Sequence, residues 1–95
     1  MDNRKIYTEK LTAKLNELDA EIKRFEAKLN SKKVDLQVEY QQQIDELKKL
    51  KEQAAEKLKQ VNESGGGAWQ EMKEGLEKSW QVLEESIKNA WTKFK

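Results

Sequence analysis

The side chains that could do chemistry in this chain are carboxylates, lysines and hydroxyls, because it contains neither cysteine nor histidine. Without cysteine there are no disulfides, thiolate nucleophiles or cysteine-based zinc sites, and without histidine the commonest general base and transition-metal ligand are missing. Carboxylates adjoin each other at Asp45-Glu46 and at Glu84-Glu85. Neighbouring side chains on a helix point about 100° apart, so neither pair converges as a catalytic dyad. We therefore expect no enzyme activity, cofactor, metal ion or small-molecule ligand.

Charge and hydropathy narrow the class of protein further. The 95 residues carry 19 Lys and Arg against 18 Asp and Glu, a net charge of +1, and make up one small domain spanning residues 1–95. A nucleic-acid-binding protein usually shows a basic excess, which the balance of charges does not indicate. No apolar run is long enough for a transmembrane helix, and residues 1–5 lack the apolar core of a secretory signal. We expect a cytoplasmic protein.

The elements that position these side chains are predicted to be helices throughout. Glu, Lys, Leu, Ala and Gln are abundant, and there is no proline. From Tyr7 to Val61 the large apolar residues recur at steps of three and four, with a mean spacing of about 3.6 residues, which is typical of one helical face. Many of them also recur every eleven residues, as in Tyr7, Leu18, Leu29 and Tyr40, which favours a straight or slightly right-handed seam over a leucine-zipper heptad.

The glycine run after Ser64 predicts the main chain reversal. Gly65, Gly66 and Gly67 would cost about 3 kcal/mol inside a helix relative to alanine, so a turn over residues 64–67 is favoured. The apolar phase continues across the glycines, which leaves a single helical rod as the alternative. Beyond them, the eleven-residue pattern repeats three times, and predicts a helix over about residues 68–94.

Residues 30–33 decide the architecture. If the chain stays helical there, a helix over about residues 3–63 is roughly 90 Å long, and the shorter C-terminal helix can cover only its second half. The stripe from Tyr7 to Leu29 must then be covered by a second chain, in an antiparallel, domain-swapped dimer that pairs Leu29 with Leu36. If the chain turns at 30–33, it forms a monomeric three-helix bundle instead. No glycine or proline marks these residues, so we favour the helical hairpin that assembles into an elongated bundle, and keep the three-helix bundle as the alternative.

One set of apolar and small residues is predicted to mediate helix packing and self-association. Tryptophans 69, 80 and 91 share one face, beside a ridge of small residues that includes Gly75, which we interpret as a close-contact site for another helix. The competing interpretation is an amphipathic helical protein that either binds lipid surfaces or is stress-protective. The C-terminal segment lacks the excess of basic residues that lipid-binding helices favour. The predicted packing residues are Leu18, Ile22, Phe25, Leu29, Leu36, Tyr40, Ile44, Leu47, Trp69, Met72, Gly75, Leu76, Trp80, Leu83, Ile87 and Trp91.

Residues 68–80 (AWQEMKEGLEKSW), which follow a glycine-containing break, resemble the C-terminal part of a family of small bacterial coiled-coil proteins. Residues 40–47 (YQQQIDEL) and the tyrosine near the N-terminus are similar too, so the resemblance covers most of the chain. The three glycines and Asn30-Ser31 depart from the family pattern. These proteins are sometimes described as stress-response proteins, and the resemblance implies no enzyme activity and no cofactor.

Overall fold

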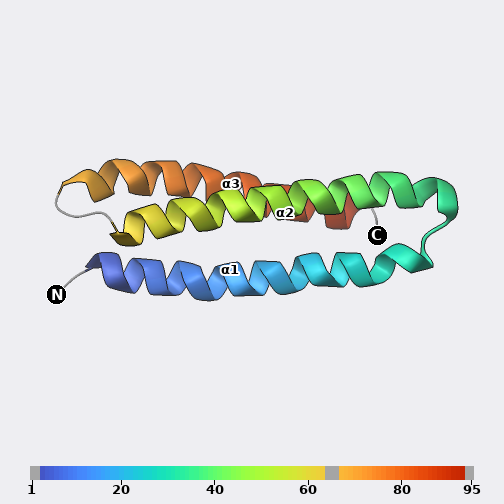
Figure 1. Ribbon diagram of the computed structural model, residues 1–95, viewed down its shortest axis with the longest axis horizontal. Coiled ribbons are helices and arrows are strands. Elements are labelled where there is room, and N and C mark those ends of the chain that lie inside the picture. The colour runs from blue at the N-terminus through green and yellow to red at the C-terminus, as the bar shows by residue number, and fades with distance from the viewer. Residues whose placement is uncertain (1–2, 64–66, 94–95) are drawn as a thin grey trace.

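The computed structural model describes residues 3–63 and 67–93, and within these ranges the regular structure is entirely helical. Helix α1 spans Asn3–Lys28, the short 3-10 helix η1 spans Leu29–Ser31, α2 spans Val34–Glu63 and α3 spans Ala68–Lys93. The long helices lie side by side in a rod with Cα extents of 51 × 18 × 18 Å, α2 running antiparallel to α1 and α3 (Figure 1). The prediction of an all-α fold is confirmed, and the arrangement is a three-helix bundle.

Helix α2 is the centre of the packing. It lies against both other helices along most of its length, whereas α1 and α3 contact each other at few places. The apolar steps of three and four place one stripe of each helix in a common core. The buried apolar side chains are Leu18, Ile22 and Phe25 of α1; Tyr40, Ile44, Leu47, Ala54, Leu58 and Val61 of α2; and Leu76, Trp80, Leu83, Ile87 and Ala90 of α3.

The favoured continuous helix over residues 3–63 is corrected by the structure, which turns between Lys28 and Val34. Side chains end α1 without glycine or proline: the Ser31 hydroxyl donates to the Lys28 carbonyl at 2.7 Å, and the Gln37 amide donates to the Lys32 carbonyl at 3.0 Å. Lys32 is extended, with φ −88° and ψ 153°. Serine competes in this way for backbone groups that a continuing helix would use. The alternative, a three-helix bundle with a turn near residues 30–33, is the observed arrangement.

This turn changes what covers the N-terminal stripe. Leu18, Ile22 and Phe25 are buried by α2 and α3 of the same chain, so no second chain is needed to cover them. The structural reason given for a domain-swapped dimer therefore does not hold for the bundle.

The second reversal separates α2 from α3. Gly67 lies in a turn directly before α3, and Figure 1 shows α3 returning alongside α2. The predicted turn residues Gly65 and Gly66 lie outside the described residues. A Cβ added at Gly67 would meet nothing within 4 Å, so the space around this residue would accept a side chain.

Candidate interaction surfaces

Most of the residues predicted to pack helices are in the core, but two are on the surface. Leu29, Trp69 and Trp91 are half-buried against the core. Leu36 and Met72 are 42% and 38% exposed, so in this bundle they are not core residues. Leu36 lies near the start of α2, which extends past the end of α3 as described to Lys93 (Figure 1), and Met72 lies near the start of α3.

Two aromatic pairs join α1 to α3, one near each end of the rod. Tyr7 meets Trp69 edge-on with ring centroids 6.1 Å apart, and Phe25 lies over Trp91 at 4.1 Å. A lysine ammonium covers each pair: Lys73 lies 5.0 Å from the Tyr7 ring, and Lys28 lies 4.7 Å from the Trp91 ring. Aromatic contacts of this kind stabilise by roughly 0.5–1.5 kcal/mol beyond their buried area. The α1–α3 seam is thus held mainly at its two ends.

The Tyr7 hydroxyl donates a hydrogen bond to Glu77 Oε1 at 3.3 Å. Burial of the phenol, the charge of Glu77 and this hydrogen bond together raise the pKa of Tyr7 to about 12. All three effects favour the protonated phenol, which keeps this end of the seam closed at neutral pH.

Between the two aromatic pairs, an open groove of about 490 Å³ runs along the α1–α3 seam. Its apolar floor is made by Leu18, Ile87 and Trp91. Both edges carry charge of both signs. Lys14 and Glu21 line the α1 edge, and Glu84 and Lys88 line the α3 edge. The one ion pair that crosses it among the described residues joins Lys14 Nζ to Glu84 Oε1 at 3.7 Å. We name this feature the α1–α3 groove.

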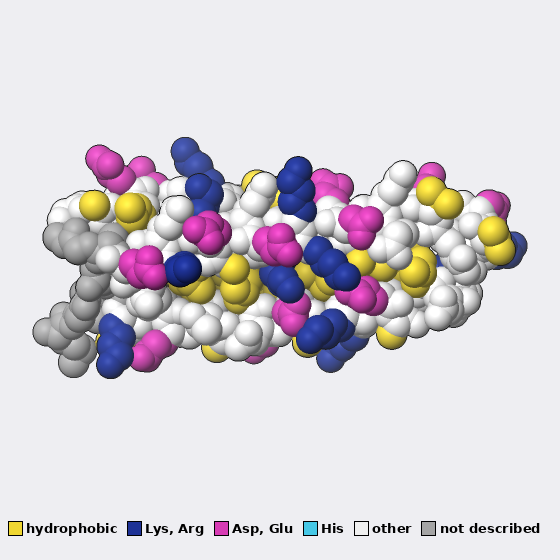
Figure 2. All heavy atoms as spheres, in the orientation of Figure 1, with side chains coloured by type: hydrophobic (Ala, Val, Ile, Leu, Met, Phe, Trp, Pro, Cys, Tyr) yellow, Lys and Arg dark blue, Asp and Glu magenta, His cyan; other side chains and the backbone are white. Residues whose placement is uncertain are grey.

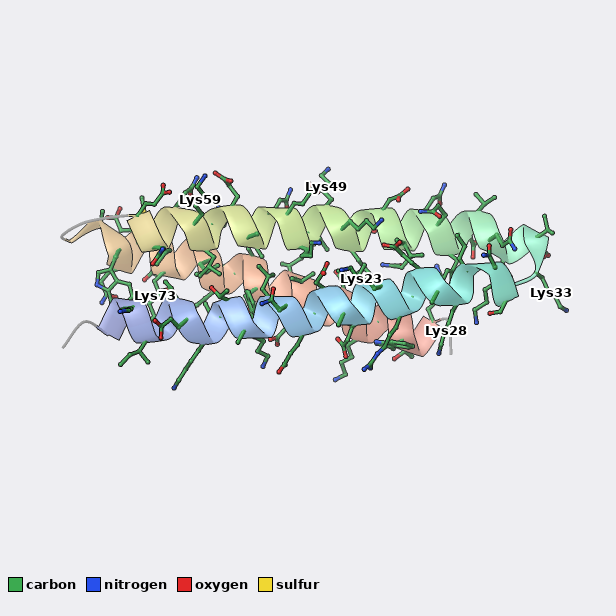
Figure 3. The ribbon with its side chains drawn as sticks, turned by 60° about the horizontal axis from the view of Figure 1, so that its bottom comes forward. Lys23, Lys28, Lys33, Lys49, Lys59 and Lys73 are labelled. Carbon is green, nitrogen blue, oxygen red and sulfur yellow. The ribbon has the colours of Figure 1, made fainter. Side chains whose placement is uncertain are left out.

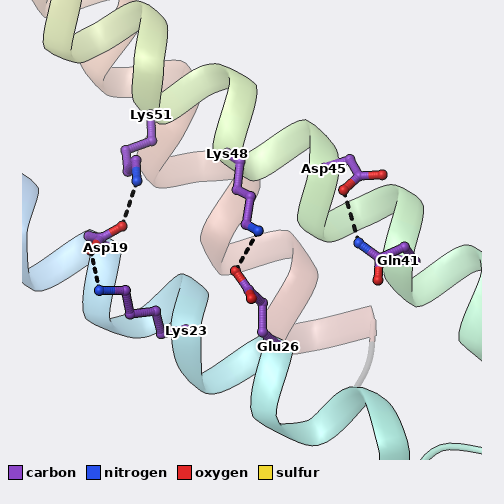
Figure 4. Close-up of polar contacts among 7 residues, drawn as sticks. All are labelled: Asp19, Lys23, Glu26, Gln41, Asp45, Lys48 and Lys51. Carbon is purple, nitrogen blue, oxygen red and sulfur yellow. Dashed lines mark hydrogen bonds and ion pairs between the residues drawn. The ribbon is translucent and has the colours of Figure 1, made fainter.

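The α1–α2 seam is instead closed by ion pairs (Figure 4). Lys51 Nζ lies 2.6 Å from Asp19 Oδ1, and Lys23 approaches the other oxygen of the same carboxylate at 3.2 Å. Lys48 pairs with Glu26 at 2.8 Å. The hydrogen bond from Lys51, supported by Lys23, lowers the pKa of Asp19, and the hydrogen bond to Glu26 raises the pKa of Lys48. Each pair therefore favours the charged forms that hold α1 against α2.

Exposed apolar side chains gather at the end of the rod where α1 turns into α2. Val34 is 81% exposed and Val38 63%, while Leu36 is 42% exposed. Valines 34 and 38 are four residues apart and so lie on one helix face. Figure 2 shows hydrophobic spheres at this end, on the right of the view. We name this surface the tip: residues 28–38, with the three apolar side chains just given.

One carboxylate of each adjacent acidic pair accepts a hydrogen bond from a residue of its own helix. Among the described residues, no three His, Cys, Asp or Glu side chains are grouped so that they could hold a metal ion. Asp45 accepts a hydrogen bond from Gln41 at 2.9 Å, and Glu84 accepts one from the Trp80 indole at 2.7 Å, so each has a structural partner. No described helix is long and apolar enough to cross a membrane.

The predicted close-contact role of Gly75 is corrected. A Cβ built at Gly75 would meet only the flexible Lys57 ammonium, at 3.9 Å, which is an ordinary contact distance. The ridge of small residues on α3 consists of Ala68, Gly75, Ser79, Ser86 and Ala90, and of these only Ala90 is fully buried, at 1% exposure. The small ridge therefore does not bring another backbone against Gly75 within this bundle.

Sequence reasoning also missed a buried polar residue. Thr8 is only 4% exposed, and its hydroxyl lies 3.1 Å from the Lys5 carbonyl and 3.4 Å from Asn62 Oδ1. It precedes Leu11 by three residues, so the helical phase of the seam places it toward α2. That spacing was the available signal.

Comparisons with protein-family models, with curated proteins and with solved structures found no match for this chain.

Proposed function

We propose that the protein is a non-enzymatic, cytoplasmic structural protein that self-associates as an antiparallel dimer through the α1–α3 groove. The observation that carries the proposal is the combination of an apolar floor with edges of alternating charge. The side of the rod, 51 Å long and 18 Å wide, is large enough for an interface of about 800 Å² on each partner. Trp91, which is half-buried, supplies the apolar centre that such interfaces need, above the nearly buried Leu18 and Ile87.

The charges on the groove edges are self-complementary. When two copies meet groove to groove in antiparallel directions about a two-fold axis, α1 lies over α1 and α3 over α3. Lys14 of each copy then faces Glu21 of the other, and Glu84 faces Lys88. A two-fold interface requires such self-complementarity, because the same patch serves both subunits. Complementary charges fix orientation and register more than they add affinity.

Lipid binding by the tryptophan face is less well supported, because that face is occupied within the chain. Trp80, Leu83 and Ile87 are all under 8% exposed, turned toward the core. The resemblance to small bacterial coiled-coil proteins adds a role in stress response to the proposal. Growth of a deletion strain under heat, osmotic and oxidative stress tests that part.

A charge-complementation experiment tests the dimer. Variant Glu21→Lys makes the α1 edge basic, and variant Lys14→Glu makes it acidic. Each should dimerise more weakly than the unmodified protein in sedimentation equilibrium across a dilution series, whereas an equimolar mixture should restore the dimer as a heterodimer. The matched control is Glu56→Lys, an exposed glutamate on α2 away from the groove.

The outcomes separate clearly. If the protein stays monomeric at every concentration up to about 1 mM, self-association is rejected. The free energy of association would then be weaker than roughly 4 kcal/mol, the value that corresponds to a dissociation constant of about 1 mM. A dimer that neither single variant weakens rejects the groove as its interface. Weakening in both variants without recovery in the mixture rejects the antiparallel arrangement.

A further inference from the structure

The near-neutral balance of charges conceals a basic end of the rod. The segments around the α1–α2 turn and the end of α3, residues 23–43 and 88–93, contain seven Lys and Arg against three Asp and Glu. Lys28 and Lys33 are exposed at this end, and Figure 3 shows both of them there, whereas Lys59 and Lys73 lie toward the other end. One of the acidic residues, Glu26, is paired with Lys48, and one of the basic residues, Lys23, is paired with Asp19, so six basic residues remain against two acidic ones.

The same end carries the two most exposed large hydrophobic residues of the described chain. Val34 at 81% and Val38 at 63% are more exposed than any other large hydrophobic residue described. They belong to the helix that starts directly after Lys32 and Lys33, so apolar and basic groups share the tip. This juxtaposition arises only because the chain turns at residues 29–33.

The size and charge of the tip select its partner. The end face of a rod 18 Å across offers a few hundred square ångströms, whereas a stable protein interface needs about 800 Å² on each partner. A second copy would also bring two basic tips together, which is repulsive. A bilayer with anionic headgroups has neither restriction, since it attracts the lysines and accepts the valines between its headgroups.

We propose that the tip, formed by Val34, Leu36 and Val38 with Lys28 and Lys33, is a docking site for an anionic lipid surface, onto which the bundle stands end-on. The lysines provide attraction that salt weakens, and the valines enter the interfacial region. The folded bundle keeps its tryptophans inside throughout. The tip is equally accessible in a monomer, so this site does not depend on the proposed dimer.

The test is co-sedimentation of the full chain with vesicles of equal parts phosphatidylglycerol and phosphatidylcholine, compared with vesicles of phosphatidylcholine alone. The protein should bind the anionic vesicles more tightly, and less tightly as salt rises. Lys28→Gln with Lys33→Gln should weaken binding about thirtyfold, since two surface lysines are lost. The control pair Lys49→Gln with Lys59→Gln removes the same charge from exposed positions on α2 away from the tip.

The apolar part is tested separately. Val34→Ser with Val38→Ser should weaken vesicle binding about tenfold or more, because two methyl-bearing side chains no longer enter the interface. Its control, Ile6→Ser with Val82→Ser, alters hydrophobic residues that are also exposed, at 42% and 48%, but lie outside the tip. Circular dichroism of each variant confirms that the bundle is retained.

Four results would overturn the proposal. Equal binding to neutral and anionic vesicles removes the role of charge. Equal losses in the tip and control pairs remove the role of the tip. If the protein does not bind vesicles and the valine pair of substitutions changes its molar mass in solution, the tip is a protein-contact surface. If the protein binds an oligonucleotide through the lysines and not the valines, the tip is a nucleic-acid site.

Discussion

Substitution of Gly75 by alanine should stabilise the protein. Gly75 is the eighth residue of the 26-residue helix α3 and has no role in a turn. Alanine is about 1 kcal/mol more favourable than glycine inside a helix, because glycine loses more backbone freedom on folding. The new methyl group meets only the Lys57 ammonium at 3.9 Å, so no steric cost offsets this gain.

Urea unfolding followed by circular dichroism, at a protein concentration low enough to keep the chain monomeric, measures the change. With a slope of about 1–2 kcal/mol per molar urea, the midpoint should rise by roughly 0.5–1 M. The matched reverse substitution is Ala90→Gly, also in α3 but fully buried, which should cost about 2 kcal/mol from lost helix propensity and lost burial. A lowered midpoint for Gly75→Ala would refute the reasoning and restore the interpretation of Gly75 as a close contact between helices.

Three further predictions concern the seams. Trp91→Ala removes the ring that packs on Phe25 and should destabilise the bundle by about 2 kcal/mol in urea unfolding. This is less than the loss of a fully buried tryptophan would cost, because Trp91 is only half-buried. An unchanged urea midpoint would contradict the contact between α1 and α3 at this end. Because the folded-state pKa of Asp19 is lowered, its stabilisation is present above the ordinary pKa of 3.8 and is lost as pH falls through the lowered value. Asp19→Asn should therefore cost about 0.5–1 kcal/mol at pH 7, and progressively less as pH falls below 3.8. A cost that does not change with pH would count against the ion pair. Because the pKa of Tyr7 is raised from 10.0 to about 12, its stabilisation is present below pH 10 and is lost as pH rises toward 12. Tyr7→Phe should therefore reduce the fall in unfolding free energy between pH 10 and pH 12. If the absorbance of the Tyr7 tyrosinate titrates at the ordinary pKa, the contact with Glu77 is excluded.

The helical class and the core were readable from the sequence because they depend on one strong signal, the steps of three and four between apolar residues. Ile22, Phe25, Tyr40, Ile44, Leu47, Leu76 and Leu83, all predicted to pack, are each nearly inaccessible to solvent. Residues 34–40 alternate apolar and polar side chains, a pattern that also fits a β-strand, but they form the start of α2. That alternation has its own explanation, because Val34 and Val38 extend past the part of α2 that other helices cover.

The turn at residues 29–33 was not predicted as the favoured architecture, for a physical reason. Helix ends are usually marked by glycine or proline, and here the termination rests on single side chains, Ser31 and Gln37, that bond to the backbone. The apolar phase runs through these residues almost unbroken, so periodicity alone cannot distinguish a straight helix from a reversal that preserves the seam. The tip and the α1–α3 groove depend on that reversal, and so neither surface could be derived before it was known.

The central claim is that α1 folds back on α2 within one chain, and one distance measures it directly. Glu9 and Lys59 line the same depression between α1 and α2, but they would be about 75 Å apart in a continuous helix. Because the chain has no cysteine, Glu9→Cys with Lys59→Cys can carry two spin labels, and pulsed dipolar spectroscopy in a large excess of unlabelled protein reports the distance within one chain. The bundle predicts a distance between the labels comparable to its 18 Å width plus the label arms. A distribution centred near 75 Å would contradict the bundle. It would show that the helix is straight and that α1 is exchanged between two chains to complete the core.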